Sequence, residues 1–220
     1  MYKLAHDLHF ALCPTRTIFL DVGRARYFCL AVDPDQAFRR WANGDRGDGL
    51  YGQLDSLVAK GYLTAASEGS TPERRFPILN TAAEDIKIER IDAPWRIIVP
   101  VLIAFVRAQW IIRHGGFKAA IDCVSTPGSG KIGPRSETAR RDVVRAYLIG
   151  RRRIPFAPAC LRDSLAMLIF LRRQGLSADF IVGVSDTPFT AHCWLQDRQV
   201  VLNDTVENVA DFVPILVIRP

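Results

Sequence analysis

The chain has 220 residues, of which 49% are hydrophobic and 24% are charged, and its formal net charge is +6. This apolar content is enough for the core of one or two domains and excludes a disordered chain. The five cysteines are odd in number and widely spread, with no CxxC pair, which argues against a disulfide framework and against a zinc site. From the cysteines we expect no bound metal and a reducing compartment. The first residues lack the apolar stretch of a secretory signal, so we expect that compartment to be the cytoplasm.

The N-terminal part predicts a small sheet. Pro14 and Gly23 supply turns between short runs that are rich in aliphatic and aromatic residues. The predicted strands cover residues 8–12, 17–22 and 26–31.

Helices are expected after these strands. Asp33 or Asp35 could cap the first helix, and leucines recur at helical spacing in the second, at Leu50, Leu54 and Leu57. Residues 62–64 resemble a wing strand, and the polar, breaker-rich segment 68–81 predicts a linker. We therefore expect two domains, at residues 1–80 and 81–220.

An apolar stretch at residues 97–106 contains Pro100 and is flanked by arginines. Ten residues are too few to span a bilayer. The pattern predicts a buried helix that runs on through Trp110 and Ile112, with contact at a membrane interface as a minor alternative.

The positive charge is concentrated between Lys131 and Arg153. Such a stretch is usually the solvated face of a helix, but it could also guide an acidic peptide, nucleic acid or a membrane surface. No nucleotide-binding motif is evident, because the loop at residues 127–132 lacks the first glycine and the final Ser or Thr of a phosphate-binding loop.

Cys160 stands where an apolar helix is predicted to begin. Pro155 and Pro158 keep the preceding chain extended, and the unpaired N–H groups of a helix start favour a thiolate. The helix should be buried and central, ending in two arginines and Gly175.

His192 and Asp204 follow in chain order. Runs at residues 179–184, 191–195, 199–202 and 212–218 predict antiparallel strands, which would place these two side chains on neighbouring strands. A lone cysteine or histidine is more often part of a core. In this order and context, however, Cys160, His192 and Asp204 form the pattern of a nucleophile, its base and the residue that orients the base.

The segment CLRDSLAMLIFLRRQGLSADFIVGVSDTPFTAHCWLQDRQVVLND resembles the transglutaminase-like cysteine-peptidase domain of lasso-peptide B proteins. The shared features are the Cys-Leu helix, Leu-Arg-Arg-x-Gly, Gly-Val, Ala-His-x-Trp and a closing Asp. Cys193 stands where that family commonly has Ala. The resemblance implies a papain/transglutaminase-like domain whose Cys160, His192 and Asp204 cleave the leader from a ribosomally made precursor. It further implies an asparagine-synthetase-like cyclase as partner and raises the possibility of an ATP requirement, although no cofactor is evident.

The N-terminal strands and helices are similar, by pattern alone, to the winged-helix-like leader-recognition domain of the coenzyme-PQQ chaperone. That resemblance implies that a leader peptide adds as a strand beside the third strand. The implied leader-binding residues are Arg26, Tyr27, Phe28, Cys29 and Leu30.

The expected fold is α+β, with a winged-helix-like domain followed by a cysteine peptidase domain. The expected partners are the leader segment and the cyclase, with no nucleic acid and no transmembrane segment. Two alternatives remain open. One is a transglutaminase-type acyl transferase with the same triad, and the other is a non-enzymatic basic regulator that binds nucleic acid, which leaves the Cys, His and Asp order to chance.

Overall fold

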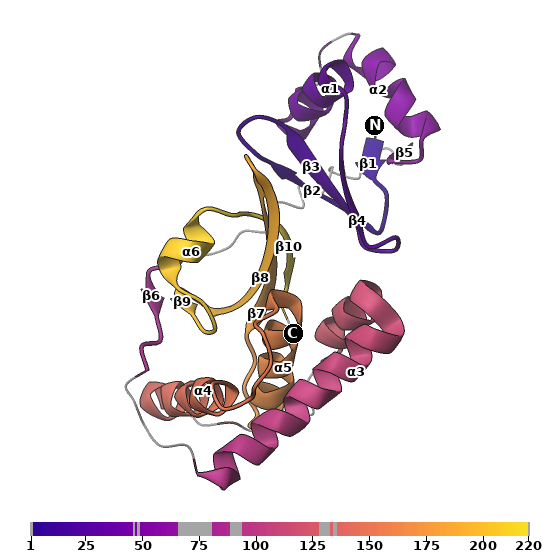
Figure 1. The fold of residues 1–220 in the computed structure, drawn as a ribbon. Helices are drawn as coiled ribbons and strands as arrows, with labels where there is room; N and C mark the ends of the chain where they lie inside the picture. Colours follow the sequence, from indigo (N-terminus) through magenta and orange to yellow (C-terminus); the bar gives the residue numbers. More distant parts are fainter. Residues whose placement is uncertain are drawn as a thin grey trace. The chain divides into compact units, whose positions relative to one another are not determined.

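The structure is a computed structural model that combines helices and strands, as an α+β chain should (Figure 1). It describes residues 2–45, 47, 49–65, 81–88, 94–127, 133 and 136–219. The predicted linker lies outside these residues except for Thr81, and so does the loop at 127–132 except for Pro127. The chain divides into two compact units, the first comprising residues 1–77, 184–190 and 213–216 and the second comprising residues 78–183, 191–212 and 217–220.

The first unit contains an antiparallel sheet in the order β2-β3-β4. Its strands are β2 (Leu8–Leu12), β3 (Thr17–Asp21) and β4 (Arg26–Cys29), close to the three predicted runs. The third strand ends early because Ala31 is already the N-cap of the following helix. The expected strand near residue 63 is β5 (Leu63–Ala65), which pairs with β1 (Tyr2–Leu4), a strand that the sequence did not predict.

Two helices, α1 (Val32–Ala42) and α2 (Leu50–Ala59), complete the first unit. The prediction that Asp33 or Asp35 caps α1 is wrong: the helix begins earlier, and buried Asp35 accepts hydrogen bonds from the backbone N–H of Thr17 at 3.2 and 3.3 Å. A buried carboxylate needs such a donor, so Asp35 ties α1 to β3 instead. The leucines of α2 are buried as expected.

Most of a five-stranded sheet and four helices belong to the second unit. The sheet has the order β10-β7-β8-β9-β6, and its β6–β9 pair is parallel. Its strands are β6 (Glu84–Asp85), β7 (Asp179–Asp186), β8 (Phe189–Asp197), β9 (Val200–Val201) and β10 (Val213–Ile218). The helices are α3 (Trp95–Ser125), α4 (Glu137–Arg151), α5 (Cys160–Arg173) and α6 (Val206–Ala210).

Helix α5 is the central element of the second unit, as predicted. It begins at Cys160, and every residue from Ser164 to Leu171 is buried. Gly175 follows it with a φ of 72°, the left-handed conformation in which glycine ends a helix without strain. The helix packs against α3 on one side and hydrogen-bonds to β8 on the other (Figure 1).

The prediction of a buried helix at 97–112 is right about the helix and wrong about its burial. Helix α3 runs to Ser125 and changes direction at Gly116, whose φ and ψ are not helical. Val101 and Phe105 face the core, whereas Trp110 and several aliphatic side chains remain exposed. An even distribution of apolar residues around a helix gives no sign of which side is covered.

Tight packing in the second unit gives a stability test at Gly183 in β7. A Cβ atom there would lie 2.7 Å from Cζ3 of Trp194 and 2.8 Å from Cβ of Phe212. We expect Gly183→Ala to lower the free energy of unfolding by about 1–3 kcal/mol, because the buried Trp194 ring and the chain at Phe212 would both have to move. Urea unfolding followed by tryptophan fluorescence and circular dichroism measures this loss.

Gly52→Ala is the matched control, since a Cβ at Gly52 in α2 meets nothing within 4 Å. Replacing glycine in an exposed helix raises stability by up to about 1 kcal/mol. Equal stability of the wild type and Gly183→Ala would contradict the packing described for this strand.

Candidate functional site

Cys160 occupies the first position of α5 and is half-buried. The start of the helix is fixed by Asp163, which accepts a hydrogen bond from the N–H of Ala159 at 3.0 Å. Arg151 of α4 in turn binds both carboxylate oxygens of Asp163, at 3.0 and 3.2 Å. Bidentate pairs of this kind have a defined geometry, so the backbone that carries the thiol is held in place.

His192 lies in β8 and is largely buried, with 18% of its side chain exposed. Its Nε2 hydrogen-bonds to Oδ2 of Asp204. The expectation that Asp204 lies on a strand is wrong, because β9 ends at Val201 and Asp204 stands in the turn before α6. There its Oδ1 accepts from the N–H of Thr205 at 2.8 Å and from Nδ2 of Asn208 at 2.9 Å.

The structure brings Cys160, His192 and Asp204 together within the second unit. The Cys160 thiol is hydrogen-bonded to the His192 ring. Because Asp204 holds Nε2, Nδ1 is the ring nitrogen that remains to take the thiol proton. This is the order of contacts that a nucleophile, its base and an orienting carboxylate require.

The electrostatics of the site favour an ion pair. A hydrogen bond from the Cys193 thiol and another from His192 lower the pKa of Cys160 to about 4, although burial opposes the shift. Hydrogen bonds to Asp204 and Cys160 raise the pKa of His192 to about 9. Burial would raise the pKa of Asp204, but the hydrogen bonds from His192, Asn208 and Thr205 outweigh it and lower that pKa. Between pH values of about 4 and about 9, the thiolate of Cys160 and the imidazolium of His192 therefore coexist.

The sequence analysis noted Cys193 only as a replacement for the family's common Ala and assigned it no role in the site. Both its thiol and its backbone N–H hydrogen-bond to Cys160. The hydrogen bond to Cys160 and burial raise the pKa of Cys193 well above its usual range, so it stays protonated and can donate. The only sequence signal was its position beside His192.

A buried polar bridge between α5 and β8 was also missed. Oγ of Ser164, one turn after Cys160, donates to the carbonyl oxygen of Cys193 at 3.0 Å. Nδ2 of Asn203 donates to the same Oγ at 2.8 Å, and Oδ1 of Asn203 accepts from the N–H of Leu195 at 2.8 Å. A single small polar residue inside an apolar helix, as Ser164 is, was the signal that could have indicated this bridge.

Trp194 belongs to the core rather than to an exposed wall. It is 1% exposed and packs with Ile181, Val201 and Val209. Its ring also stacks against the ring of His192, with 6.1 Å between centroids, and so limits the movement of the imidazole.

The five residues expected to bind a leader lie on or directly after β4, an edge strand of the described sheet. Phe28 stacks on Phe19 with 5.1 Å between ring centroids, and Leu30 packs on the same core. Tyr27 contacts Phe189, with 5.5 Å between centroids, while Arg26 and Cys29 are exposed. The strand thus has one face in the core and lies at the edge of the described three-stranded sheet.

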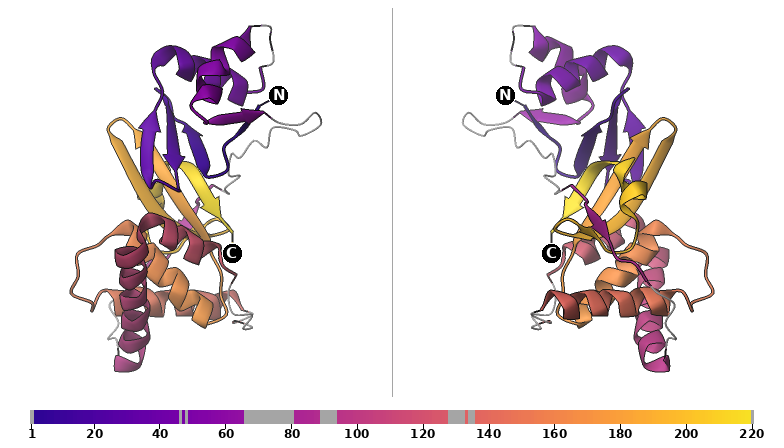
Figure 2. Two further views of the ribbon diagram at one scale, coloured as in Figure 1. Left: turned by 90° about the vertical axis from the view of Figure 1, so that its right-hand side faces the viewer. Right: turned by 90° about the vertical axis from the view of Figure 1, so that its left-hand side faces the viewer.

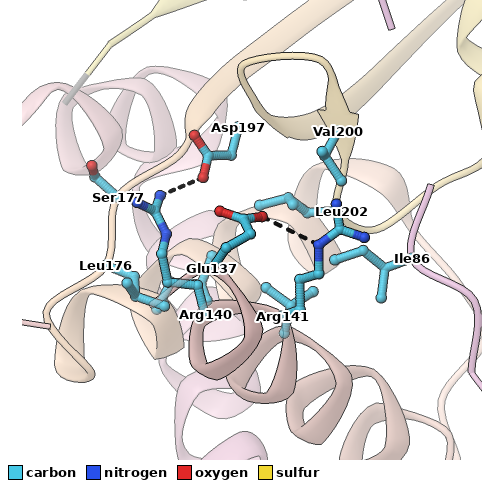
Figure 3. A pocket seen from close by; sticks show the side chains of 11 residues that line it. Ile86, Glu137, Arg140, Arg141, Leu176, Ser177, Asp197, Val200 and Leu202 are labelled. Atoms are coloured by element: carbon cyan, nitrogen blue, oxygen red, sulfur yellow. Dashed lines mark hydrogen bonds and ion pairs between the residues drawn. The ribbon is translucent and has the colours of Figure 1, made fainter. Parts of the chain in front are cut away.

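Away from the triad, a pocket between α4 and the β8–β9 hairpin is lined by charged and aliphatic side chains (Figure 3). Its guanidinium groups already have partners: Arg140 pairs with Asp197, and Arg141 pairs with Glu84 and Glu137. The pairs with Asp197 and Glu84 join α4 to the sheet, and together with the Arg141–Glu137 pair within the helix they leave little positive charge for a bound anion. Within the described ranges, no group of three His, Cys, Asp or Glu side chains could hold a metal ion.

Comparison with known families agrees with this geometry. Residues 102–217, more than half of the chain, match the transglutaminase-like superfamily. The chain belongs to that superfamily. Its members are typically cysteine peptidases or acyltransferases, so the family supports an enzyme that works through a cysteine. No curated protein and no solved structure matches the chain.

The ion pair gives a prediction for the pH dependence of alkylation. With its pKa near 4, Cys160 should react with iodoacetamide at full rate from about pH 5 upward, whereas a free thiol ionises only near pH 8.5. His192→Ala removes the positive charge and should move this profile to higher pH. Cys193→Ala should move it less, because a thiol is a weak donor, and Asp204→Asn, one step further away, should also have a smaller effect.

Site-specific labelling measured by mass spectrometry separates Cys160 from the other thiols. Exposed Cys29 serves as the internal reference, and its profile should be the same in every variant. Superimposable Cys160 profiles in the wild type and His192→Ala would mean that the two side chains do not interact. The triad would then be wrong.

Proposed function

We propose that this protein is a cysteine peptidase that removes the leader from a ribosomally made lasso-peptide precursor. The observation that carries the proposal is the hydrogen-bonded chain from Cys160 through His192 to Asp204. The superfamily match supports cysteine chemistry, and the Cys-Leu helix with the Ala-His-x-Trp segment supports the narrower assignment.

In the acylation step, the Cys160 thiolate attacks the carbonyl carbon at the junction of leader and core. The backbone N–H of Cys160, at the start of α5, is the proposed donor to the developing oxyanion. The imidazolium of His192 then protonates the leaving amine, which is the new N-terminus of the core peptide. Leader and enzyme remain joined as a thioester.

In the second step, neutral His192 takes a proton from water, and the resulting hydroxide attacks the thioester. The tetrahedral adduct expels the Cys160 thiolate, which restores the thiolate–imidazolium pair, and the leader leaves as a carboxylic acid that gives its proton to solvent. Asp204 holds the ring so that Nδ1 faces the reaction in both steps. Both ionised forms are needed, so turnover should fall below about pH 4 and above about pH 9.

We assign leader recognition to the first unit, as a winged-helix-like domain. The position of β4 at the edge of the described sheet supports this role, because an extended peptide can add to an edge strand as a further strand. The released core peptide would pass to an asparagine-synthetase-like cyclase. Whether ATP stimulates cleavage is tested by running the same reaction with and without ATP and Mg²⁺.

The ion pairs of α4 disfavour the alternative of a nucleic-acid-binding regulator. Arg140, Arg141 and Arg151 contact carboxylates of the chain itself, as does Arg145, which pairs with Asp142. A phosphate backbone would have to compete with these partners. The proposed partners are therefore peptides and proteins.

The decisive variant is Cys160→Ala. Mixed with a lasso-peptide precursor, the wild-type protein should release leader and core peptides, and the variant should leave the precursor intact, a loss of at least about 10³-fold without the nucleophile. Mass spectrometry of the products measures both. Cys123→Ala, at a half-buried cysteine outside the triad, is the control and should cleave like the wild type.

Product masses also distinguish the two classes of enzyme. Hydrolysis leaves a leader with a free carboxylate, whereas an acyl transferase would attach an added primary amine in its place. Amine-linked leader as the main product would overturn the peptidase assignment. Cleavage by Cys160→Ala at the wild-type rate would overturn the nucleophile.

Leader recognition is tested at the exposed edge residue Cys29. We expect Cys29→Glu to weaken binding of a leader peptide at least about tenfold, because a charged side chain beside the added strand disturbs its pairing. Titration calorimetry on full-length protein carrying Cys160→Ala measures the affinity. Gln53→Glu, which adds the same charge on exposed α2, should bind like the parent.

Cleavage at saturating precursor should change little in Cys29→Glu alone, since the triad is untouched. Unaltered leader affinity in this variant, or binding of the core peptide in place of the leader, would remove the assignment of β4.

A further inference from the structure

Helix α3 carries an uncovered apolar stripe. Six large apolar side chains, each between 41% and 77% exposed, follow one another at helical spacing. They lie on one side of the helix over about 22 Å, from the rise of 1.5 Å per residue. They are Trp95, Val99, Leu102, Ile103, Val106 and Trp110. Soluble proteins rarely leave such a continuous apolar surface open unless it binds something.

Along the helix segment that carries this stripe, the charged side chains have one sign. From Trp95 to Ile121 the chain contains no Asp or Glu, while Arg96, Arg107 and Arg113 are exposed on the same helix. The stripe begins and ends with tryptophan, whose ring suits the boundary between lipid headgroups and acyl chains. Exposed apolar side chains, terminal tryptophans and exposed arginines together complement an anionic lipid surface.

By length and composition α3 could also cross a membrane, and only 22% of its apolar window is buried. Its inner face argues against spanning. Phe105 packs on Phe156, with 5.3 Å between centroids, and lies beneath the guanidinium groups of Arg151 and Arg162 at 5.1 and 4.5 Å. Inserting the helix across a bilayer would break this packing or carry both arginines into hydrocarbon.

We propose that the exposed stripe of α3 docks on the surface of an anionic bilayer, with the helix lying in the plane of the interface. Among the described residues the stripe stays exposed while the inner side of the helix packs against α5, and Figure 2 shows α3 along the outside of the second unit. Docking would hold the peptidase at a membrane. This role is separate from the proposed leader cleavage and does not depend on it.

Vesicle flotation of the full-length protein tests the proposal without any substrate. Wild-type protein should float with vesicles of phosphatidylcholine and phosphatidylglycerol, and bind at least tenfold less to phosphatidylcholine alone. The double variant Val106→Glu/Trp110→Glu places two carboxylates on the stripe and should lose binding at least tenfold. Gln53→Glu/Ser56→Glu, with the same charge change on exposed positions of α2, should bind like the wild type.

Several outcomes would overturn the proposal. If the wild-type protein does not bind anionic vesicles, or if the stripe variant binds them as well as the wild type, then the stripe does not dock on lipid. A dimer in sedimentation that only the stripe variant abolishes assigns the face to a second copy. Vesicle-bound protein that resists alkaline carbonate and needs detergent for release indicates a spanning helix. Precursor cleavage, assayed in solution, is a separate readout for the proposed peptidase.

Discussion

The site depends on one alignment: the start of α5 must lie beside the middle of β8. Cys160 is on the helix and His192 is on the strand, and a proton can pass between them only at hydrogen-bond distance. Apolar packing alone is not directional enough to set that distance. The bridge from Ser164 to the carbonyl of Cys193 is directional, and it joins the residue one turn after the nucleophile to the residue next to the base. Without the Ser164 hydroxyl, the carbonyl of Cys193 would lose this donor and Nδ2 of Asn203 would lose this acceptor, while Oδ1 of Asn203 would still accept from Leu195.

Charge in the site is distributed so that each group satisfies its neighbour. One carboxylate oxygen of Asp204 is hydrogen-bonded to His192. The other accepts hydrogen bonds from Thr205 and Asn208 at the start of α6, so the carboxylate cannot rotate freely. Cys193 remains a protonated donor beside the thiolate, which gives that thiolate a hydrogen bond without a second negative charge. The short helix α6 thus contributes to the site through its capping residues, although it carries no member of the triad.

The sequence was most informative where chemistry and local structure coincide. Cys160 could be placed because prolines, a helix start and an apolar helix body occur together, and that helix is found as predicted. Asp204 could be proposed as a partner of His192. The turn that carries it could not be predicted, because the following helix α6 is only five residues long and has no strong periodicity. The bridge through Ser164 and Asn203 joins positions 39 residues apart. Contacts at that separation depend on the tertiary fold, and residue spacing does not encode them.

Helix α3 is where the sequence pattern failed most clearly to predict burial. The reason lies in the different roles of its two sides. Its inner side must be apolar to pack beside α5, where Val101, Ala104 and Ala108 are almost completely buried. If its outer side meets lipid, that side must be apolar as well, so the helix loses the contrast between faces from which burial is normally inferred. The two sides remain separate in space, because the buried residues and the residues of the stripe alternate along the sequence and therefore lie on opposite sides of the helix. A change in the stripe can therefore alter where the protein resides while the packing that positions Cys160 is preserved.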